Sequence, residues 1–380
     1  MTALIISFTT RPNEGSEGGV GWNFLLAAAQ LAQSRAIRVH AIIDERDADS
    51  VRAAIALTSF GQFLELHPVA IPTQLRDRFG ASRSRGSYLA WYPGAFKLAV
   101  RLHREHSFTT AHQVTFATAT LPPVLPRSLP QKIWGPLAVA SQPLVNAHGR
   151  VDRSDAMQTA IAKKVGIRFA TYPDICLVQN RLTARALHDQ VENIIVEPNI
   201  VVEPDSAKEP IAGKLVFAGN LIDRKRPWIL LQVLKTHIMR DFVVEFVGDG
   251  PLRGSLESFT RQERLDNRVN FRGRVTREES LDIISSSSAL VLPSSREGAP
   301  WVVGEAAARG VPSVVSDISG AGTVVELSGM GVEIVENSDP IRTINEFRCG
   351  ILKATENPDR TPTSRWSAAR LPNILDDIWN

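Results

Sequence analysis

The stretch "ALVLPSSREGAPWVVGEAAARGVPSVVSD" occupies residues 289–317 and contains a complete strand–helix–strand unit. Its two ends, "ALVLP" and "PSVVSD", are short apolar runs typical of buried strands. Pro300 and Gly310 bracket the segment between them, which predicts a helix over 300–310. Two strands joined by a helix are the unit of a parallel sheet, so this stretch predicts an α/β fold.

The same alternation of apolar runs and helical segments continues on both sides of this stretch. Further strands are predicted at 3–8, 38–44, 63–69, 131–135, 175–179, 193–198, 214–219, 242–248 and 268–273, and a helix at 22–34 follows a loop at 11–21. Residues 199–213 carry prolines and charges with little periodicity, which is typical of a linker. We therefore predict two Rossmann-like domains, in residues 1–200 and 201–363.

Composition excludes some classes of protein. No apolar run in the 380 residues approaches the roughly 18 to 20 residues needed to span a bilayer. The N-terminal "MTALIISF" lacks a basic region and predicts a strand, not a signal peptide. Two cysteines give no disulfide framework, and together these features predict a cytoplasmic protein. A net charge of +3 fits phosphate-bearing ligands or an anionic membrane surface.

Two glutamates in the opening stretch are candidate binding residues. Glu297 directly follows the strand "ALVLP", and Glu305 lies in the middle of the predicted helix. Glu297 is therefore expected at the carboxyl edge of the sheet, where ligands bind in open α/β folds. A carboxylate can accept hydrogen bonds from two hydroxyls, which suits sugar diols. A solvated helix residue and a turn acid are the alternative interpretation of the same spacing.

The opening stretch resembles the E-x7-E signature of glycosyltransferase family 4. Four further segments resemble motifs of that family in the same order, namely "VEPNIV" (196–201), "FAGNLIDRKRP" (217–227), "VVEFVGDGPLRGSLE" (243–257) and "VNFRGRVTREE" (269–279). In the N-terminal half, "NEGSEGGVGWNFL" and "HQVTFATATLP" resemble a branch of the family from bacterial surface-polysaccharide clusters. The resemblance implies a GT-B fold, with two Rossmann-like domains facing a central cleft. It also implies that residues 364–380 form a helix that crosses back to the N-terminal domain.

The resemblance further implies an activity. Family members are retaining enzymes that transfer a sugar, usually a hexose, from a nucleotide-diphosphate donor to a glycan or lipid-linked acceptor. By this resemblance Glu297 contacts the donor sugar and Glu305 the ribose hydroxyls. Lys225 is one of the family's two cations that neutralise the leaving diphosphate. Asn220 occupies the position of the second cation, an arginine, and Arg224 or Arg226 is expected to compensate.

Other positions carry roles by resemblance that composition alone does not suggest. The backbone of Gly298, Ala299 and Pro300 is expected beside the sugar and diphosphate, and Arg274 and Val275 are expected near the nucleobase. Four further residues have two open interpretations. Asp249 caps a helix or contacts the donor, and Gly18 and Gly19 approach a ligand or form an ordinary turn. His112 lies near the sugar or is structural.

Two other functions fit the same features. A sugar-nucleotide epimerase of GT-B fold would turn over donor without an acceptor, and a non-catalytic binder would do neither. A dehydrogenase is disfavoured because "GSEGGVG" and "GDGPLRG" do not reproduce G-x-G-x-x-G. No D-x-D segment stands in a convincing loop, so we expect no metal ion and no cofactor besides the donor substrate. No nucleic-acid partner is predicted.

Residues 76–106 combine basic and aromatic side chains and predict contact with a membrane. A helix is expected after Pro93–Gly94, with Lys97, Arg101 and Arg104 on one stripe. Basic residues interleaved with Phe79, Tyr88, Trp91, Tyr92 and Phe96 suit an anionic membrane surface at the inner face of the cell membrane. The alternative is an ordinary amphipathic helix with a solvated basic face.

Overall fold

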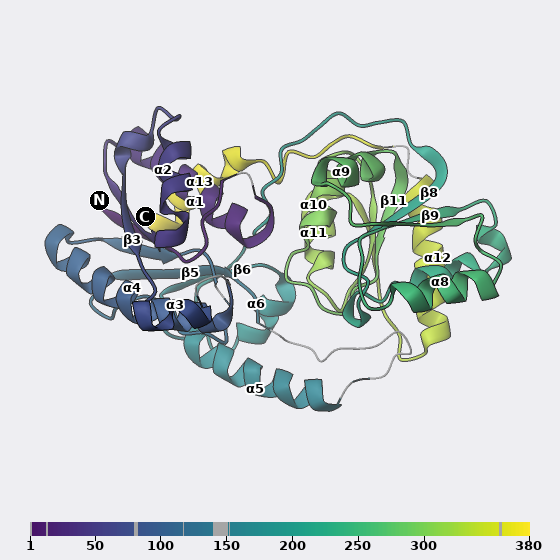
Figure 1. Ribbon diagram of the computed structural model, residues 1–380, viewed down its shortest axis with the longest axis horizontal. Coiled ribbons are helices and arrows are strands. Elements are labelled where there is room, and N and C mark those ends of the chain that lie inside the picture. Colours follow the sequence, from purple (N-terminus) through teal and green to yellow (C-terminus); the bar gives the residue numbers. More distant parts are fainter. Residues whose placement is uncertain are drawn as a thin grey trace. The chain divides into compact units, whose positions relative to one another are not determined.

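The computed structural model describes residues 2–12, 14–79, 83–116, 118–139, 151, 153–356 and 359–380 (Figure 1). The chain forms two compact units. The N-terminal unit consists of Met1–Ser141, Ala160–Val201 and Ala368–Asn380, and the C-terminal unit consists of Gln142–Thr159 and Val202–Ser367. Each unit is built on one parallel β-sheet, as the alternation of strands and helices predicts.

The N-terminal sheet has seven strands in the order β3-β2-β1-β4-β5-β6-β7. The strands are β1 (Ala3–Ser7), β2 (Val39–Asp44), β3 (Leu64–Val69), β4 (Thr110–Gln113), β5 (Gln131–Leu137), β6 (Ile175–Val178) and β7 (Ile194–Val196). All described pairings are parallel. The strand order reverses between β1 and β4, which makes the loops after these two strands the topological switch point, where ligands bind in doubly wound folds.

The central strands β1 and β2 are buried along their whole lengths. Helices therefore cover both faces of this sheet. The helices of this part of the chain are α1 (Ser16–Arg35), α2 (Ala48–Ile55), α3 (Thr73–Phe79), α4 (Arg85–His106), α5 (Arg153–Ala170), α6 (Arg181–Leu187) and α13 (Leu371–Trp379). Leu4, Ile6 and Ile42 of the sheet share one apolar cluster with Trp91 and Ala95 of α4.

The C-terminal helix α13 belongs to the N-terminal unit and packs on α1, as expected for a GT-B fold (Figure 1). Leu371, Leu375 and Ile378 of α13 are buried. The segment before the helix is held by Arg370, whose guanidinium pairs with Glu197 at 3.0 Å and donates to the carbonyl oxygen of Ile200 at 2.6 Å. The last residues of the chain therefore complete the first unit.

Two helices begin earlier than their sequences predict. Helix α1 begins at Ser16 and not at 22, so the glycine-rich segment forms its first turn. Helix α4 begins at Arg85 and not after Gly94, and Pro93 lies inside it. Its start is fixed by Ser84, whose hydroxyl accepts from the Ser87 N–H at 3.2 Å, while the Ser87 hydroxyl accepts from the Ser84 N–H at 2.8 Å.

The C-terminal sheet has six strands in the order β10-β9-β8-β11-β12-β13. The strands are β8 (Ile211–Ala218), β9 (Val243–Val247), β10 (Val269–Gly273), β11 (Ser287–Leu292), β12 (Ser313–Ser316) and β13 (Gly331–Ile334). Their pairings are parallel, and the order again reverses once, between β8 and β11. The five predicted strands of this part are confirmed, and the edge strand β13 is an addition.

The C-terminal unit also contains short helices that follow each strand. They are η3 (Asp223–Lys225), α7 (Trp228–Leu234), η4 (His237–Met239), α8 (Arg253–Gln262), α9 (Arg277–Ser285), α10 (Trp301–Ala307), α11 (Ala321–Ser328) and α12 (Pro340–Glu356). Within the described residues of both units, every helix is too short or too polar to cross a lipid bilayer.

Candidate functional site

The switch point of the C-terminal sheet holds a compact charge cluster. Glu297 lies in the loop after β11, and Arg224 and Lys225 lie in η3, in the loop after β8. The Lys225 ammonium nitrogen Nζ donates to Glu297 Oε1 at 2.8 Å, and Arg224 Nη1 lies 3.0 Å from Glu297 Oε2. One carboxylate therefore bridges two cations at the sheet edge where open α/β folds bind ligands.

The Glu297 carboxylate is held in its charged form. Burial raises the pKa of this carboxyl, but Lys225 and Arg224 lower it through their charges and hydrogen bonds, and the net pKa is below its ordinary value. Glu297 is therefore an anion at neutral pH and is poorly suited to donate a proton. It can hold two cations in place and can stabilise a positive charge.

The loop after β8 is shaped to bring Lys225 to Glu297. The Lys225 side chain passes over Gly219, where an added Cβ would lie 3.0 Å from Lys225 Cε and 3.1 Å from Nζ. Gly219 has a φ of +145°, a backbone conformation that favours glycine. The carbonyl oxygen of Arg224 accepts from the Ser295 N–H at 2.8 Å, which joins the two loops through backbone as well as side chains.

The structure separates the two arginines that were expected to replace the missing family arginine. Arg226 is 2% exposed and its guanidinium pairs with Glu336, with Nη1 to Oε2 at 2.8 Å. Its Nε donates to the carbonyl oxygen of Pro293 at 2.7 Å. Arg226 is therefore a buried structural cation, and only Arg224 reaches Glu297. Asn220 is exposed at the end of β8.

Glu305 lies on α10 as predicted, with a partner that the sequence did not indicate. Its Oε1 accepts from Arg277 Nη2 at 2.7 Å and from Nε at 3.2 Å, across from the start of α9. The Arg277 side chain is 55% exposed, whereas that of Glu305 is 14% exposed. A ligand hydroxyl can therefore replace Arg277 on this carboxylate at little cost in buried structure.

The remaining predicted donor contacts lie on loops at the same sheet edge. Gly298, Ala299 and Pro300 form the end of the loop after β11, and Pro300 caps α10 in an extended conformation (φ −70°, ψ 118°). Arg274 and Val275 follow β10, and Asp249 follows β9 and accepts from the Gly250 N–H at 2.8 Å. Asp249 also lies 3.7 Å from Arg253.

A cavity of about 480 Å³ lies at the switch point of the N-terminal sheet. It is lined by the loops after β1, β4, β5 and β6, by the start of α1 and by Arg83. The Phe116 N–H donates to Glu17 Oε1 at 2.6 Å, and burial raises the pKa of the Glu17 carboxyl despite this bond.

Gly18 and Gly19 lie in the first turn of α1 and not in a loop, and Gly18 lines this cavity, so their approach to a ligand stays a prediction. A Cβ at Gly18 would lie 3.1 Å from Glu14 Oε2 and 3.2 Å from Arg11 Cβ. The close approach at Gly18 is therefore to the chain's own loop, which borders the cavity.

His112 lies in the core of the N-terminal unit, which favours its structural interpretation. It is fully buried in β4, and its Nε2 lies 2.9 Å from the carbonyl oxygen of Gly135. Its ring meets Phe24 edge to face at 5.7 Å between centroids. Burial lowers the pKa of His112 to about 4, so the ring is neutral at neutral pH.

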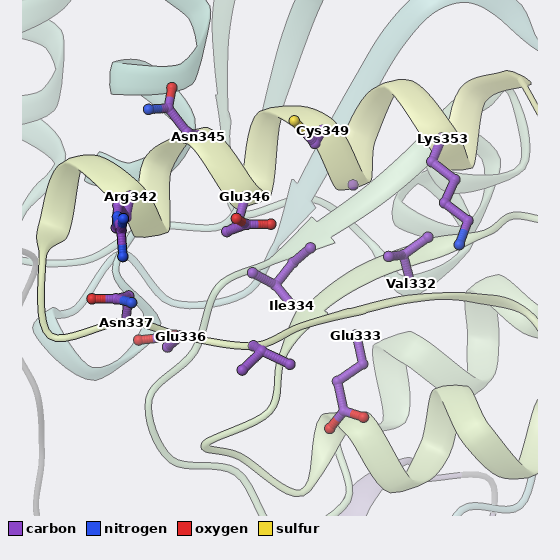
Figure 2. A pocket seen from close by; sticks show the side chains of 12 residues that line it. Val332, Glu333, Ile334, Glu336, Asn337, Arg342, Asn345, Glu346, Cys349 and Lys353 are labelled. Atoms are coloured by element: carbon purple, nitrogen blue, oxygen red, sulfur yellow. The ribbon is translucent and has the colours of Figure 1, made fainter.

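A second hollow of about 700 Å³ lies at the edge of the C-terminal sheet. Figure 2 shows its two walls, with Val332 and Ile334 on β13 and Arg342, Glu346 and Lys353 on α12. None of the predicted donor contacts lines it. Its polar residues have both signs of charge, and we assign no function to it.

Helix α4 agrees only in part with the membrane-binding helix predicted within residues 76–106. Lys97, Arg101 and Arg104 are exposed on α4, as the stripe predicts. Tyr88 and Trp91 are instead fully buried against the sheet, so they cannot be membrane anchors. Residues 80–82 of the predicted membrane segment lie outside the described residues.

Part of the sequence is similar to known glycosyltransferases. Residues 212–348, within the C-terminal unit, match a family model described as "Glycosyl transferases group 1". The Bacillus subtilis (strain 168) protein EpsF is 38% identical over 93 residues, which are 23% of this chain and 24% of EpsF. An Escherichia coli UDP-Gal:alpha-D-GlcNAc-diphosphoundecaprenol alpha-1,3-galactosyltransferase is 30% identical over 128 residues, 33% of this chain and 31% of that protein. The chain thus matches a quarter to a third of the length of these curated relatives.

Solved structures match over the whole chain. The lipopolysaccharide outer core galactosyltransferase WaaB has a TM-score of 0.62 at 14% identity and covers 100% of this chain and 96% of its own. Anabaena HepE in complex with UDP-glucose has a TM-score of 0.56 at 13% identity and covers 99% and 98%. Identities this low establish the fold alone, and that fold is GT-B.

Proposed function

We propose that the chain is a retaining glycosyltransferase. It moves a hexose from a nucleotide-diphosphate donor to a glycan or lipid-linked acceptor, in the synthesis of a cell-surface polysaccharide. The observation that carries this proposal is the Glu297 carboxylate bridging Lys225 and Arg224 at the switch point of the C-terminal sheet. The match of residues 212–348 to group 1 glycosyl transferases supports it.

Lys225 and Arg224 are the groups that would hold the donor diphosphate. A leaving diphosphate gains negative charge as the sugar bond breaks, and fixed cations stabilise that charge most in a site that excludes water. Lys225 is 9% exposed and already positioned by Glu297, so little reorganisation is needed when the donor binds. In this proposal the two cations supply the positive charge, and the reaction uses no metal ion.

Glu297 and Glu305 have different tasks in this proposal. Glu297 is charged and mostly buried beside the cations, so in this proposal it faces the transferred sugar and stabilises the positive charge of an oxocarbenium-like state. Glu305 accepts the ribose hydroxyls in place of Arg277. The acceptor attacks on the face that the diphosphate leaves, the departing phosphate takes the acceptor proton, and no enzymic nucleophile is required.

We further propose that the acceptor side involves the N-terminal unit and an anionic membrane surface. The exposed side chains of Lys97, Arg101 and Arg104 support this contact by charge alone. Sedimentation with vesicles containing anionic lipid should require this lipid and should fall with salt. It should also fall when the three residues become glutamate, whereas equal sedimentation with neutral vesicles would contradict the contact.

A direct experiment tests the transferase activity. Purified protein is screened with nucleotide sugars by thermal shift, and the stabilising donor is then incubated with an undecaprenyl-diphosphate-linked sugar. Transfer with retained anomeric configuration, read by nuclear magnetic resonance, supports the proposal, and an inverted product rejects the retaining mechanism. Turnover of the donor without acceptor would favour an epimerase, and binding without turnover would favour a non-catalytic binder.

A further inference from the structure

The edge of the N-terminal sheet brings two histidines and a glutamate together. His40 lies on β2, and Glu65 and His67 lie on the edge strand β3. The parallel register pairs His40 with Glu65, and His67 stands two residues further along β3. Registered partners in a parallel pair, and residues two apart on one strand, point to the same face of a sheet. All three side chains therefore lie on one face.

Their ligating atoms form a small triangle. His40 Nδ1 lies 2.9 Å from His67 Nε2. Glu65 Oε2 lies 3.7 Å from His40 Nδ1, and Glu65 Oε1 lies 3.8 Å from His67 Nε2. The rings of His40 and His67 are stacked at 5.2 Å, with 9° between their planes. One ligand atom from each of the three side chains lies within 4.8 Å of the other two, close enough for one ion to contact all three.

The surroundings keep both imidazoles neutral. Burial lowers the pKa of His40 to about 4, and the charges of His106, His67 and Arg38 add to this against the opposing charge of Glu65. Burial also lowers the pKa of His67. A neutral ring offers a lone pair to a metal ion without competition from a proton at neutral pH.

We propose that His40, Glu65 and His67 form a binding site for Zn²⁺. Two imidazole nitrogens and one carboxylate oxygen are a donor set that zinc takes in proteins, with a water molecule in the fourth position. Ligands about 2.0 to 2.1 Å from a tetrahedral zinc ion lie about 3.3 to 3.4 Å from each other. The two nitrogens lie about half an ångström closer than this value, and each lies within 3.8 Å of one oxygen of the Glu65 carboxylate, so small adjustments of these side chains bring one oxygen and both nitrogens to one ion.

The structure also provides access to the triangle and a wall beside it. The Glu65 side chain is 46% exposed, whereas those of His40 and His67 are 4% and 15% exposed. An ion therefore enters past Glu65 and meets the imidazoles beneath it. The His106 ring, at the end of α4, lies over His40 with centroids 4.1 Å apart and covers that side of the site.

Binding requires one proton to move. In the metal-free protein one of the two facing nitrogens donates a hydrogen to the other. That ring must transfer its proton to its other nitrogen, so that both facing lone pairs point at the ion. The ring remains neutral, and no net proton release is needed from the imidazoles.

This site is separate from the donor site in composition and in role. It lies in the N-terminal unit and shares no residue with the Glu297 cluster. It does not depend on the proposed transferase activity, and the expectation of a metal-free donor site is not altered by it.

The test uses the full chain, freed of metal with a chelator and then titrated with Zn²⁺ in a calorimeter. We expect one zinc ion per chain. The variants His67→Ala and Glu65→Gln should each weaken binding by about tenfold or more, because each removes one of three ligands. His188→Ala is the matched control, since His188 and Asp189 form an exposed histidine–carboxylate pair 3.5 Å apart. This control should bind zinc like the wild type.

Two results would overturn the site. One is the absence of zinc binding by the wild type, and the other is equal affinity in the wild type, His67→Ala and Glu65→Gln. Glu65→Gln alters a half-exposed side chain and keeps the test valid if His67→Ala fails to fold. Binding of Co²⁺ with the visible absorption of a four-coordinate ion, lost in Glu65→Gln, would give the same answer by spectroscopy.

Discussion

The two switch points of the molecule have the same topology, but each shifts the pKa of a nearby glutamate in the opposite direction. In each sheet the order reverses once, between β1 and β4 or between β8 and β11, and a glutamate stands beside the reversal. Glu297 lies between two cations and has a lowered pKa, whereas Glu17 is buried against one backbone N–H and has a raised pKa. The topology fixes where a site forms, and side chains decide what that site can bind.

The comparison predicts that the largest loss of activity follows from removing the central cation. Lys225→Ala should lower kcat/KM by about 100-fold, roughly 2.7 kcal/mol, because the diphosphate then loses its best-positioned countercharge. Steady-state kinetics with the donor identified by thermal shift measures this. Lys235→Ala is the control, since it breaks a Lys–Glu pair of similar length, 2.9 Å to Glu263, that is more exposed and lies away from the site. Equal losses in both variants would mean that Lys225 acts only on stability.

Glu297→Gln should lower kcat by at least about tenfold, because an amide cannot stabilise the positive charge of the transition state. The same change should not weaken binding of the free nucleoside diphosphate, since Lys225 and Arg224 then have no competing anion. Calorimetry and steady-state kinetics separate the two effects. A variant with normal kcat would remove Glu297 from the reaction.

Glu305→Gln should weaken binding of the free nucleoside diphosphate by about fivefold, roughly 1 kcal/mol, because one charged acceptor for the ribose becomes neutral. Arg277→Ala removes the partner of Glu305 in the unliganded protein and is the matched comparison. It should leave this affinity unchanged or improve it. Weaker binding in Arg277→Ala than in Glu305→Gln would show that the ribose is held elsewhere.

The smallest expected effects are changes in melting temperature. Glu17→Gln and Glu297→Gln should change it in opposite directions at pH 7. The raised pKa of Glu17 costs stability once the pH exceeds its ordinary value near 4.3, so Glu17→Gln should raise the melting temperature at pH 7 but not at pH 3.5. The lowered pKa of Glu297 contributes stability above about pH 4.3 that is lost as the pH falls. Glu297→Gln should therefore lower the melting temperature at pH 7, with a smaller effect at pH 3.5. The same sign for both variants at pH 7 would contradict the contrast.

Much of the fold could be predicted from the sequence, because buried parallel strands are continuous apolar runs. The strand β13 could not, since "GVEI" is a short and only partly buried edge strand. The early start of α1 was missed because "EGG" is typical of a loop, whereas burial in the unit overrides the low helix propensity of glycine. The sequence predicts a helix only after Gly94, which places Tyr88 and Trp91 outside it. In the structure α4 begins at Arg85 and buries both side chains.

The residues of the candidate site could be predicted from the sequence, but most of their partners could not. The positions of Glu297 after a strand and Glu305 on a helix indicate these two residues, and the resemblance to family motifs implies their roles and that of Lys225. The partners of these residues depend on which loops meet in space. The pairing of Arg224 with Glu297, of Arg226 with Glu336 and of Arg277 with Glu305 could not be inferred from spacing along the chain. For His112, two interpretations fit the sequence, and only the packing around the ring shows that it is fully enclosed.

The most direct test of the central claim measures where the diphosphate binds. UDP, GDP and ADP are titrated calorimetrically into the wild type, and the best ligand and its nucleoside are then titrated into Lys225→Ala. If the Glu297 cluster holds the diphosphate, Lys225→Ala weakens the diphosphate by tenfold or more and leaves the nucleoside unchanged. Unchanged affinity for the diphosphate in this variant would contradict the account, because the charge cluster at the C-terminal switch point would then have no part in donor binding.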